Sequence, residues 1–522
     1  MLFTSYGFIG FLTVLFLLYY TVFRGNQWKL LLAFSYIFYA AAHPSYLAYI
    51  CFTTLTIYVA GLRIQGIGDD SKEYLASVKD SITKEDKKIY KTGVKRSQKK
   101  WLISCLIVNF GILIGVKYVF PVLLTFNANL IPLMDIIIPL GISFYTLQAA
   151  GYVIDVYRGT VPAEANLGRL ALFVSFFPQL IQGPISRFGD LSATLYEKHE
   201  FNPGVFCAGI ERIMWGFFKK LVIADRIGPL VAAISGDPEK YRGGYVLALL
   251  LLYTIQLYAD FTGGIDIVIG IGQSLGITVR ENFNRPYFSK TLKEYWRRWH
   301  ITMCEWFRNY VFYPVSTSKA LQSFSKFSRK TFGDRAGKRI PVYLASFIVW
   351  LLTGLWHGAG WNFIVWGLLN WFLLMMGEEL EGWSDGLEEK LHWREKFAFK
   401  AFRVLRTFLL VMALNLFDCY ATVGQTLGSF ISIFNTGNLS VLGDGSLFEL
   451  GMSPADFVLA GIGVLVMLAV SLIQRKGSLR ERIARSPFAA RSLVWIGLFM
   501  VILILGAYGI GYDASQFIYN RF

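Results

Sequence analysis

The chain has 522 residues, of which 54% are hydrophobic and only 16% are charged. Soluble domains usually carry about 25% charged residues, so this composition excludes an ordinary soluble domain and predicts a polytopic membrane protein. The formal net charge is +16, and the basic residues lie between apolar runs. This placement favours a role in membrane orientation over nucleic-acid binding.

Twelve apolar segments are expected to span the membrane or to lie buried in it. They lie at roughly 2–23, 28–42, 45–63, 101–126, 131–157, 165–186, 205–233, 244–276, 341–376, 402–434, 455–474 and 491–511. Because the longer segments can hold two helices or a broken one, we expect about 11–13 membrane helices, some of them short or re-entrant. The predicted fold is all-α, with a single membrane domain over 1–522.

Charged and polar connections orient the chain. Segment 64–100 contains ten Lys or Arg residues, and 317–340 contains seven. Segment 475–491 is also basic, whereas no Lys or Arg occurs between Arg406 and Arg475. By the positive-inside rule, the basic loops are expected to be cytoplasmic and the polar stretch 435–456 extracytoplasmic.

The five cysteines form no CxxC pair. We therefore expect neither a disulfide framework nor a metal site. Cys304 could act as an acyl-carrying nucleophile, but a cysteine that only packs is the better interpretation.

His357 lies in the apolar stretch 342–376, where an ionisable side chain is costly and by default marks a functional site. Trp356 and Asn362 lie beside it, and Gly358 removes side-chain bulk next to it. Burial disfavours the charged imidazole, which keeps it available as a base near neutral pH. The alternative is a hydrogen-bonded core histidine that holds helices together.

A second histidine lies in EYWRRWHITMCEWFRNYVFYP, residues 294–314. If this block is one helix, Arg297 and His300 share a face, as do His300 and Cys304. Paired Arg297 and Arg298 could hold a phosphate, or could anchor a short helix at the lipid headgroups. Two histidines at membrane depth beside these arginines are suited to acyl transfer. The donor would be a phosphorylated cytosolic thioester, and a histidine would deprotonate the acceptor hydroxyl.

The same block, with QLYADFTGGIDIVIGIGQSLGITVRENFNRPYFSKTLK before it (256–293), resembles the signature of membrane-bound O-acyltransferases, in the branch of the alginate O-acetyltransferase membrane subunit. LTGLWHGAGWNFIVWGLLN (352–370) is similar to the family's second histidine block. Three more stretches fit, namely 138–159, 173–188 and FIYNRF at 517–522.

This resemblance implies a multi-helix membrane fold around a tunnel, with short re-entrant or interfacial helices. It implies that His357 matches the central catalytic histidine and that His300 matches the second signature position, often asparagine in relatives. The usual PLGG-type loop after the block is absent, and Cys304 stands where serine is usual. These departures concern the acceptor more than the chemistry.

The predicted function is transfer of an acetyl group from cytosolic acetyl-CoA outward, for O-acetylation of an extracellular or cell-wall polysaccharide. The acetyl-CoA is a substrate, and no bound cofactor is expected. The expected partners are an extracytoplasmic SGNH-type or similar O-acetyltransferase and, indirectly, the polysaccharide. The expected location is the bacterial inner or plasma membrane.

Eight further residues are candidates for donor or substrate binding: Trp296, Arg297, Arg298, Trp299, Trp356, Asn362, Asp260 and Gln182. For Asp260, a structural ion pair is an equally good interpretation. Three other functions stay open: D-alanyl transfer to teichoic acid from a carrier-protein thioester, a transporter or flippase without covalent chemistry, and a scaffold for an extracytoplasmic partner.

Overall fold

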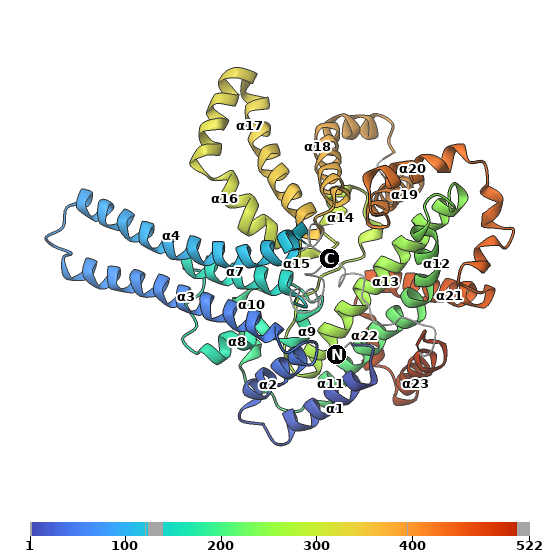
Figure 1. Ribbon diagram of the computed structural model, residues 1–522, viewed down its shortest axis with the longest axis horizontal. Coiled ribbons are helices and arrows are strands. Elements are labelled where there is room, and N and C mark those ends of the chain that lie inside the picture. Colours follow the sequence, from blue (N-terminus) through green and yellow to red (C-terminus); the bar gives the residue numbers. More distant parts are fainter. Residues whose placement is uncertain (1–2, 121, 124–138, 394, 509–522) are drawn as a thin grey trace. The chain divides into compact units, whose positions relative to one another are not determined.

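The computed structural model describes the chain except residues 1–2, 121, 124–138, 394 and 509–522 (Figure 1). Every regular element in the described part is a helix, as predicted. The backbone groups into two compact units: unit 1 comprises Met1–Phe206 and Ile271–Val279, and unit 2 comprises Cys207–Gly270 and Arg280–Phe522. The single membrane domain over 1–522 stays a prediction.

Seven helices among the described residues are long and apolar enough to cross a membrane. These spans are Tyr46–Ser77, Lys84–Val119, Gly244–Ser274, Lys319–His357, Trp361–Lys390, Pro454–Lys476 and Phe488–Leu505. The all-α membrane character is therefore confirmed. The larger expected number of helices rested on segments that fold as shorter or broken helices, and on 124–126, 131–138 and 509–511, which lie outside the described residues. The FIYNRF stretch also lies outside them.

Unit 1 is built from helices that pack through aromatic side chains. Its helices are α1 (Tyr6–Tyr20), α2 (Gln27–Ala40), α3 (Tyr46–Ser77), α4 (Lys84–Ile114), η1 (Gly115–Val119), α7 (Ile142–Arg158), α8 (Leu167–Ser175), α9 (Phe177–Leu180) and α10 (Phe188–Leu195). Phe8, Phe38 and Phe177 are fully buried, and their ring centroids lie 5.5–6.4 Å apart. Such edge-to-face and tilted contacts hold α1, α2 and α9 together.

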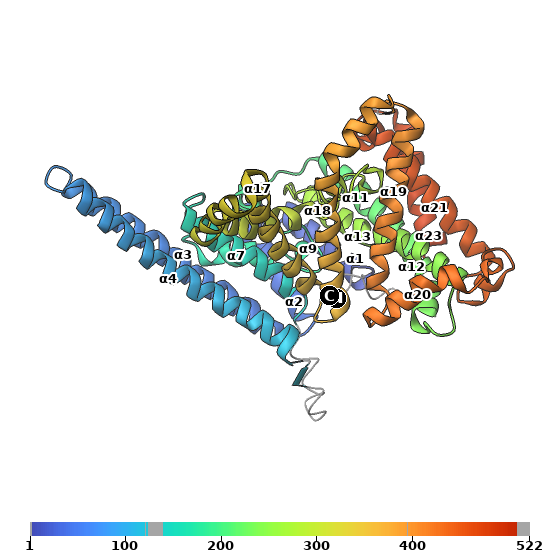
Figure 2. The ribbon, with the colours of Figure 1, turned by 90° about the horizontal axis from the view of Figure 1, so that it is seen from above.

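The predicted basic loop 64–100 is largely helical. Helix α3 continues past its apolar half to Ser77, and α4 begins at Lys84, so only a short turn separates them. Thr83 caps α4 by accepting a hydrogen bond from the Asp86 backbone N–H at 3.1 Å. Figure 2 shows α3 and α4 side by side as a long hairpin. The difference from the prediction has a physical reason, because lysine is a good helix former as well as a common loop residue.

Unit 2 holds all the remaining helices. The first group is α11 (Pro203–Phe217, of which Pro203–Phe206 lies in unit 1), η3 (Phe218–Ala224), α12 (Asp225–Gly236), α13 (Gly244–Ser274, whose last four residues lie in unit 1), η4 (Pro286–Phe288), α14 (Leu292–Trp296), α15 (Ile301–Phe307), η5 (Arg308–Phe312) and α16 (Tyr313–Ser316). The second is α17 (Lys319–His357), α18 (Trp361–Lys390), α19 (Phe397–Asn415), η6 (Leu416–Asp418), α20 (Val423–Asn435), η7 (Leu439–Leu442), η8 (Ser446–Glu449), α21 (Pro454–Ile473), η9 (Gln474–Lys476), α22 (Leu479–Ala484) and α23 (Phe488–Leu505).

Two predicted spans of unit 2 are broken. Segment 205–233 becomes α11, the π-helical η3 and α12, and segment 402–434 becomes α19, η6 and α20. The basic segment 317–340 is again largely helical. Helix α17 starts at Lys319 and consists of two helical stretches that are separated at Gly333, whose φ of 81° and ψ of 168° are not helical. The polar stretch 435–456 contains two short 3₁₀ helices joined by irregular backbone, in keeping with a loop.

Buried ion pairs attach η3 to α13. Lys220 lies 2.6 Å from Asp260 and 2.8 Å from Asp225, and its side chain is 1% exposed. Lys219 lies 2.6 Å from Asp266, which also pairs with Arg212. Breaking such a pair would leave a buried charge without compensation, so these contacts fix the two elements against each other.

Candidate active site

His357 is the last residue of α17, and close helix packing fixes its position. Helices α17 and α18 cross at Gly354 and Gly367. A Cβ on Gly354 would lie 2.5 Å from the Phe363 carbonyl oxygen, and one on Gly367 would lie 2.5 Å from that of Trp350. Only glycine permits this approach, which brings the start of α18 against the end of α17.

Aromatic rings surround His357, which is only 6% exposed. Its ring centroid lies 4.7 Å from Trp366, 5.1 Å from Trp356 and 6.2 Å from Phe363. Asn362, the second residue of α18, is buried and donates a hydrogen bond to the Tyr420 carbonyl. Its Oδ1 has no hydrogen-bond partner among the described residues, so this acceptor is available to a ligand.

His300 lies at a break between two helices, which corrects the expectation of one helix through the block. Helix α14 ends at Trp296 and α15 begins at Ile301. His300 itself is left-handed, with φ 45° and ψ 52°. Arg297 and His300 therefore share no helix face. A left-handed residue other than glycine is uncommon and places the side chain where a regular helix would not.

Asn282 positions the His300 ring. Asn282 Oδ1 accepts hydrogen bonds from the Thr302 backbone N–H at 3.0 Å and from the Thr302 hydroxyl at 2.9 Å. With its oxygen so occupied, the Asn282 Nδ2 lies 3.2 Å from His300 Nδ1. Nδ1 also lies 3.4 Å from Asn282 Oδ1, but that oxygen already accepts two hydrogen bonds from Thr302. We therefore assign Nδ1 as the acceptor of the Nδ2–H, which leaves the proton of the neutral ring on Nε2.

Burial keeps His300 neutral. The side chain is fully buried, and desolvation lowers the pKa of His300 to about 3. Phe261 packs edge-on against it at 4.9 Å. His300 is therefore an uncharged group that offers an N–H at physiological pH.

Trp356 connects the two histidines. Its ring centroid lies 6.0 Å from that of His300 and 5.1 Å from that of His357. Residues 300 and 357 are far apart in the sequence, yet both imidazoles border one indole. The structure thus brings together the two histidines predicted as catalytic.

The other predicted residues of the RRWH block differ in their surroundings. Trp299 is buried in an aromatic cluster, 5.0 Å from Phe283, and Trp296 donates its indole N–H to Asn370 Oδ1 at 3.0 Å. Arg298 pairs with Glu294 at 2.5 Å. Arg297 is exposed, and no acidic partner for it occurs in the described part of the chain. Of the two arginines, Arg297 is the one whose guanidinium is open to an anionic ligand.

Asp260 and Gln182 lie in different units. Asp260 is 1% exposed and paired with Lys220, which is the structural alternative considered for it. Gln182, in unit 1, is fully buried, and neither of its amide atoms has a partner among the described residues. An amide buried in this way calls for a bound polar group or water.

A cysteine nucleophile and a metal centre gain no support from this geometry. Desolvation raises the pKa of the Cys304 thiol to about 12, and the thiol faces the Trp299 carbonyl oxygen at 3.6 Å. The reactive thiolate is therefore scarce. Within the described ranges, no three His, Cys, Asp or Glu side chains gather in a way that could hold a metal ion.

Sequence reasoning missed several residues that shape this site. Asn282, Thr302, Phe261, Trp366 and Asn370 are not among the residues that the sequence predicts for the site. The ENFNRPY stretch contained a signal, because an asparagine that is buried in a largely apolar protein needs polar partners. Nothing local in the sequence indicates which histidine such an asparagine contacts.

Comparisons with known proteins fit these observations. Residues 163–329 match the model of the membrane-bound O-acyltransferase family. The chain is 32% identical over 461 residues to the probable alginate O-acetylase AlgI of Pseudomonas syringae pv. tomato, covering 86% of this chain and 76% of the relative. The chain belongs to the membrane-bound O-acyltransferase family. The resemblance noted in the sequence is thereby confirmed.

Two further relatives place the chain within this membrane-bound O-acyltransferase family. The probable alginate O-acetylase AlgI of Azotobacter vinelandii is 34% identical, over 70% of this chain and 66% of the relative. The peptidoglycan O-acetyltransferase of Helicobacter pylori is 33% identical, over 54% of this chain and 56% of the relative. These two matches thus span just under two thirds and just over half of the relatives' own lengths.

Proposed function

We propose that this protein is a membrane O-acetyltransferase that takes an acetyl group from cytosolic acetyl-CoA for the O-acetylation of an extracellular or cell-wall polysaccharide. Family membership and the printed activities of its relatives support the reaction class. The observation that carries the assignment to particular residues is the meeting of His300 and His357 at the ring of Trp356.

In this proposal His357 is the general base. Its imidazole removes the proton of the acceptor hydroxyl, and the oxygen attacks the thioester carbonyl carbon. A new C–O bond forms, the C–S bond breaks, and the coenzyme A thiolate takes up the proton held by His357. The products are an acetyl ester and a free thiol.

His300 has a different role from His357. With Nδ1 accepting from Asn282, its Nε2–H can donate a hydrogen bond to the carbonyl oxygen as negative charge develops there. A fixed donor inside a low-dielectric site costs no reorganisation during the reaction. Asn362 Oδ1 is available to orient the acceptor, and exposed Arg297 to attract the phosphates of the donor.

The surrounding biology follows from the same proposal. The protein acts in the inner or plasma membrane of a bacterium and passes the acetyl group to an extracytoplasmic O-acetyltransferase of the SGNH or a similar class, which completes delivery to the polysaccharide. The seven long apolar helices support a multi-pass membrane location.

The test uses the purified full-length chain in vesicles with radiolabelled acetyl-CoA. We expect release of free coenzyme A thiol and label in the acceptor fraction, and loss of both in His357→Ala by about 10²–10⁴-fold. The variant's thermal unfolding is measured alongside, to establish that it folds. Normal turnover by a folded His357→Ala protein would overturn the assignment. If the acceptor is labelled only from a D-alanyl carrier-protein thioester, that thioester is the donor instead of acetyl-CoA. If substrate crosses the membrane without release of thiol, the protein is a transporter.

A further inference from the structure

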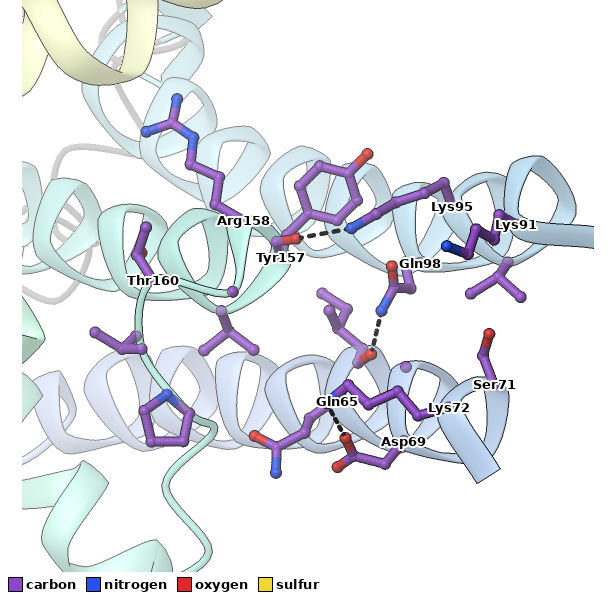
Figure 3. Close-up of a pocket in the computed structure, with 17 residues that line it drawn as sticks. Gln65, Asp69, Ser71, Lys72, Lys91, Lys95, Gln98, Tyr157, Arg158 and Thr160 are labelled. Carbon is purple, nitrogen blue, oxygen red and sulfur yellow. Dashed lines mark hydrogen bonds and ion pairs between the residues drawn. The ribbon is translucent and has the colours of Figure 1, made fainter. Parts of the chain in front are cut away.

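A pocket of about 680 Å³ lies in unit 1, apart from every residue discussed above as catalytic or substrate-binding (Figure 3). Its walls are the polar half of α3, the polar half of α4 and the residues at and after the end of α7. Helices α3 and α4 run side by side here, and the chain after Arg158 closes one end.

Positive charge prevails in this pocket. Lys72, Lys91 and Lys95 line it, against a single carboxylate, Asp69, which Lys72 contacts at 2.8 Å. Lys95 donates a hydrogen bond to the Tyr157 carbonyl oxygen at 3.4 Å and lies 5.0 Å over that residue's ring. Neither Lys91 nor Lys95 has an acidic partner in the described part of the chain. Two lysine charges are therefore available to an anion.

A buried amide forms the inner wall. Gln98 is only 7% exposed, and its Nε2 donates to the Ile64 carbonyl oxygen at 2.8 Å. Its Oε1 has no partner among the described residues. A Cβ at position 68 would lie 2.9 Å from that Nε2, so Gly68 makes room for the amide. Because the nitrogen is fixed, the oxygen is left to accept a hydrogen bond from a ligand.

The hydropathy of α3 and α4 changes at the pocket, where a membrane-spanning helix would meet the lipid headgroups. Helix α3 is apolar up to Leu62 and polar after it, whereas α4 is polar up to Lys100 and apolar from Trp101. Gln98 is therefore less than one turn from the apolar part of α4, and the α3 residues of the pocket follow directly on its apolar part. Trp101 is 40% exposed, as expected of a tryptophan at a membrane interface.

We propose that this pocket binds the headgroup of an anionic phospholipid that carries a free hydroxyl, as phosphatidylglycerol does. The phosphodiester lies between Lys91 and Lys95, and the hydroxyl donates to Gln98 Oε1. The acyl chains continue along the apolar parts of α3 and α4. A soluble phosphate ester with a hydroxyl, such as glycerol phosphate, shares this chemistry but has no acyl chains to place there.

The test measures lipid binding to the purified full-length protein in detergent, by displacement of a fluorescent phosphatidylglycerol. We expect unlabelled phosphatidylglycerol to compete, and phosphatidylcholine and free glycerol phosphate to compete at least about tenfold less well. Equal competition by phosphatidylcholine would overturn the proposal. Competition by glycerol phosphate as strong as that of the lipid would assign the pocket to a soluble ligand instead.

Matched variants locate the site. The double variant Lys91→Gln/Lys95→Gln removes two exposed charges and should weaken phosphatidylglycerol binding about tenfold. Lys326→Gln/Lys330→Gln removes two charges from another basic segment and should leave binding unchanged. Gln98→Leu, checked for normal thermal unfolding, should reduce the preference for phosphatidylglycerol over phosphatidic acid, which lacks the hydroxyl. Unchanged binding in the first variant, or equal loss in the control, would refute the assignment.

Discussion

The side-chain nitrogen of Asn282 lies 3.2 Å from Nδ1 of His300. Because Thr302 occupies the oxygen of the same amide, Asn282 acts as a donor to the imidazole and directs its proton to Nε2. In Asn282→Asp the carboxylate accepts from Nδ1–H instead, and Nε2 loses its proton. We expect kcat to fall about 10²-fold with little change in KM, as when one donor to a developing oxyanion is removed. Steady-state kinetics measure this split.

The neighbouring Asn284→Asp is the matched control. Asn284 is exposed, and its side chain contacts Arg285 rather than His300. Its kcat should stay within about twofold of the wild type, because exposed substitutions rarely matter. Equal losses in the two variants would indicate a general effect of charge on this segment.

The second prediction concerns the pH dependence of activity. Because desolvation lowers the pKa of His300 to about 3, this ring stays neutral over the range in which the enzyme can be assayed. His300→Asn keeps an N–H donor at the position. We expect a lower rate but an unchanged acid limb of kcat/KM, which then reports on another group. An acid limb that disappears in this variant would make His300 the titrating base.

The third prediction tests the crossing of α17 and α18. In Gly367→Ala the added Cβ would meet the Trp350 carbonyl oxygen at 2.5 Å, which displaces backbone. We expect a loss of about 1–3 kcal/mol in stability and a drop in activity, since the same crossing places His357. Gly377→Ala, two to three turns further along α18, has nothing within 4 Å of its Cβ and should be neutral or slightly stabilising. Melting temperatures and turnover of both variants provide the comparison.

Contacts between residues that are distant in the sequence explain why only part of the fold and of the site could be predicted. The helical membrane fold and both histidines could be predicted, because apolar length and an ionisable group at depth are local signals. The break at His300 could not be predicted, because it depends on contacts with a separate stretch of the chain. Asn282 accepts hydrogen bonds from Thr302 through its side chain and from the Ile301 N–H through its carbonyl oxygen. The high charge of 64–100 predicts a loop between membrane segments, but charged residues also form helices, and most of this segment continues α3 and α4.

The fourth prediction concerns stability and pH. Desolvation raises the pKa of Asp418 to about 7, although a hydrogen bond from Tyr253 opposes the shift. A folded-state pKa above the unfolded value means that the protonated carboxyl favours folding below about pH 4, and that this contribution is lost as pH rises through 7. Asp418→Asn should therefore melt above the wild type at pH 8.5, with the difference vanishing near pH 4. A pH-independent difference would contradict this origin.

The fifth prediction concerns Cys304. Because desolvation raises the pKa of its thiol to about 12, alkylating reagents should not label it at pH 8 in the folded protein. Cys304→Ser should keep turnover within about threefold, since the side chain only packs and donates weakly to the Trp299 carbonyl. Mass spectrometry of the labelled protein and a turnover assay check both statements. An acetyl group found on Cys304 would instead establish a covalent intermediate.

The left-handed backbone at position 300 has an evolutionary consequence. Asparagine, aspartate and histidine are the side chains that most readily tolerate this conformation besides glycine, whereas branched and bulky ones strain it. The resemblance to the wider family allows histidine or asparagine there, and these are two of the three side chains that tolerate this backbone conformation best. The backbone conformation thus limits which residue types can evolve at position 300, and the chemistry of the site selects among those few.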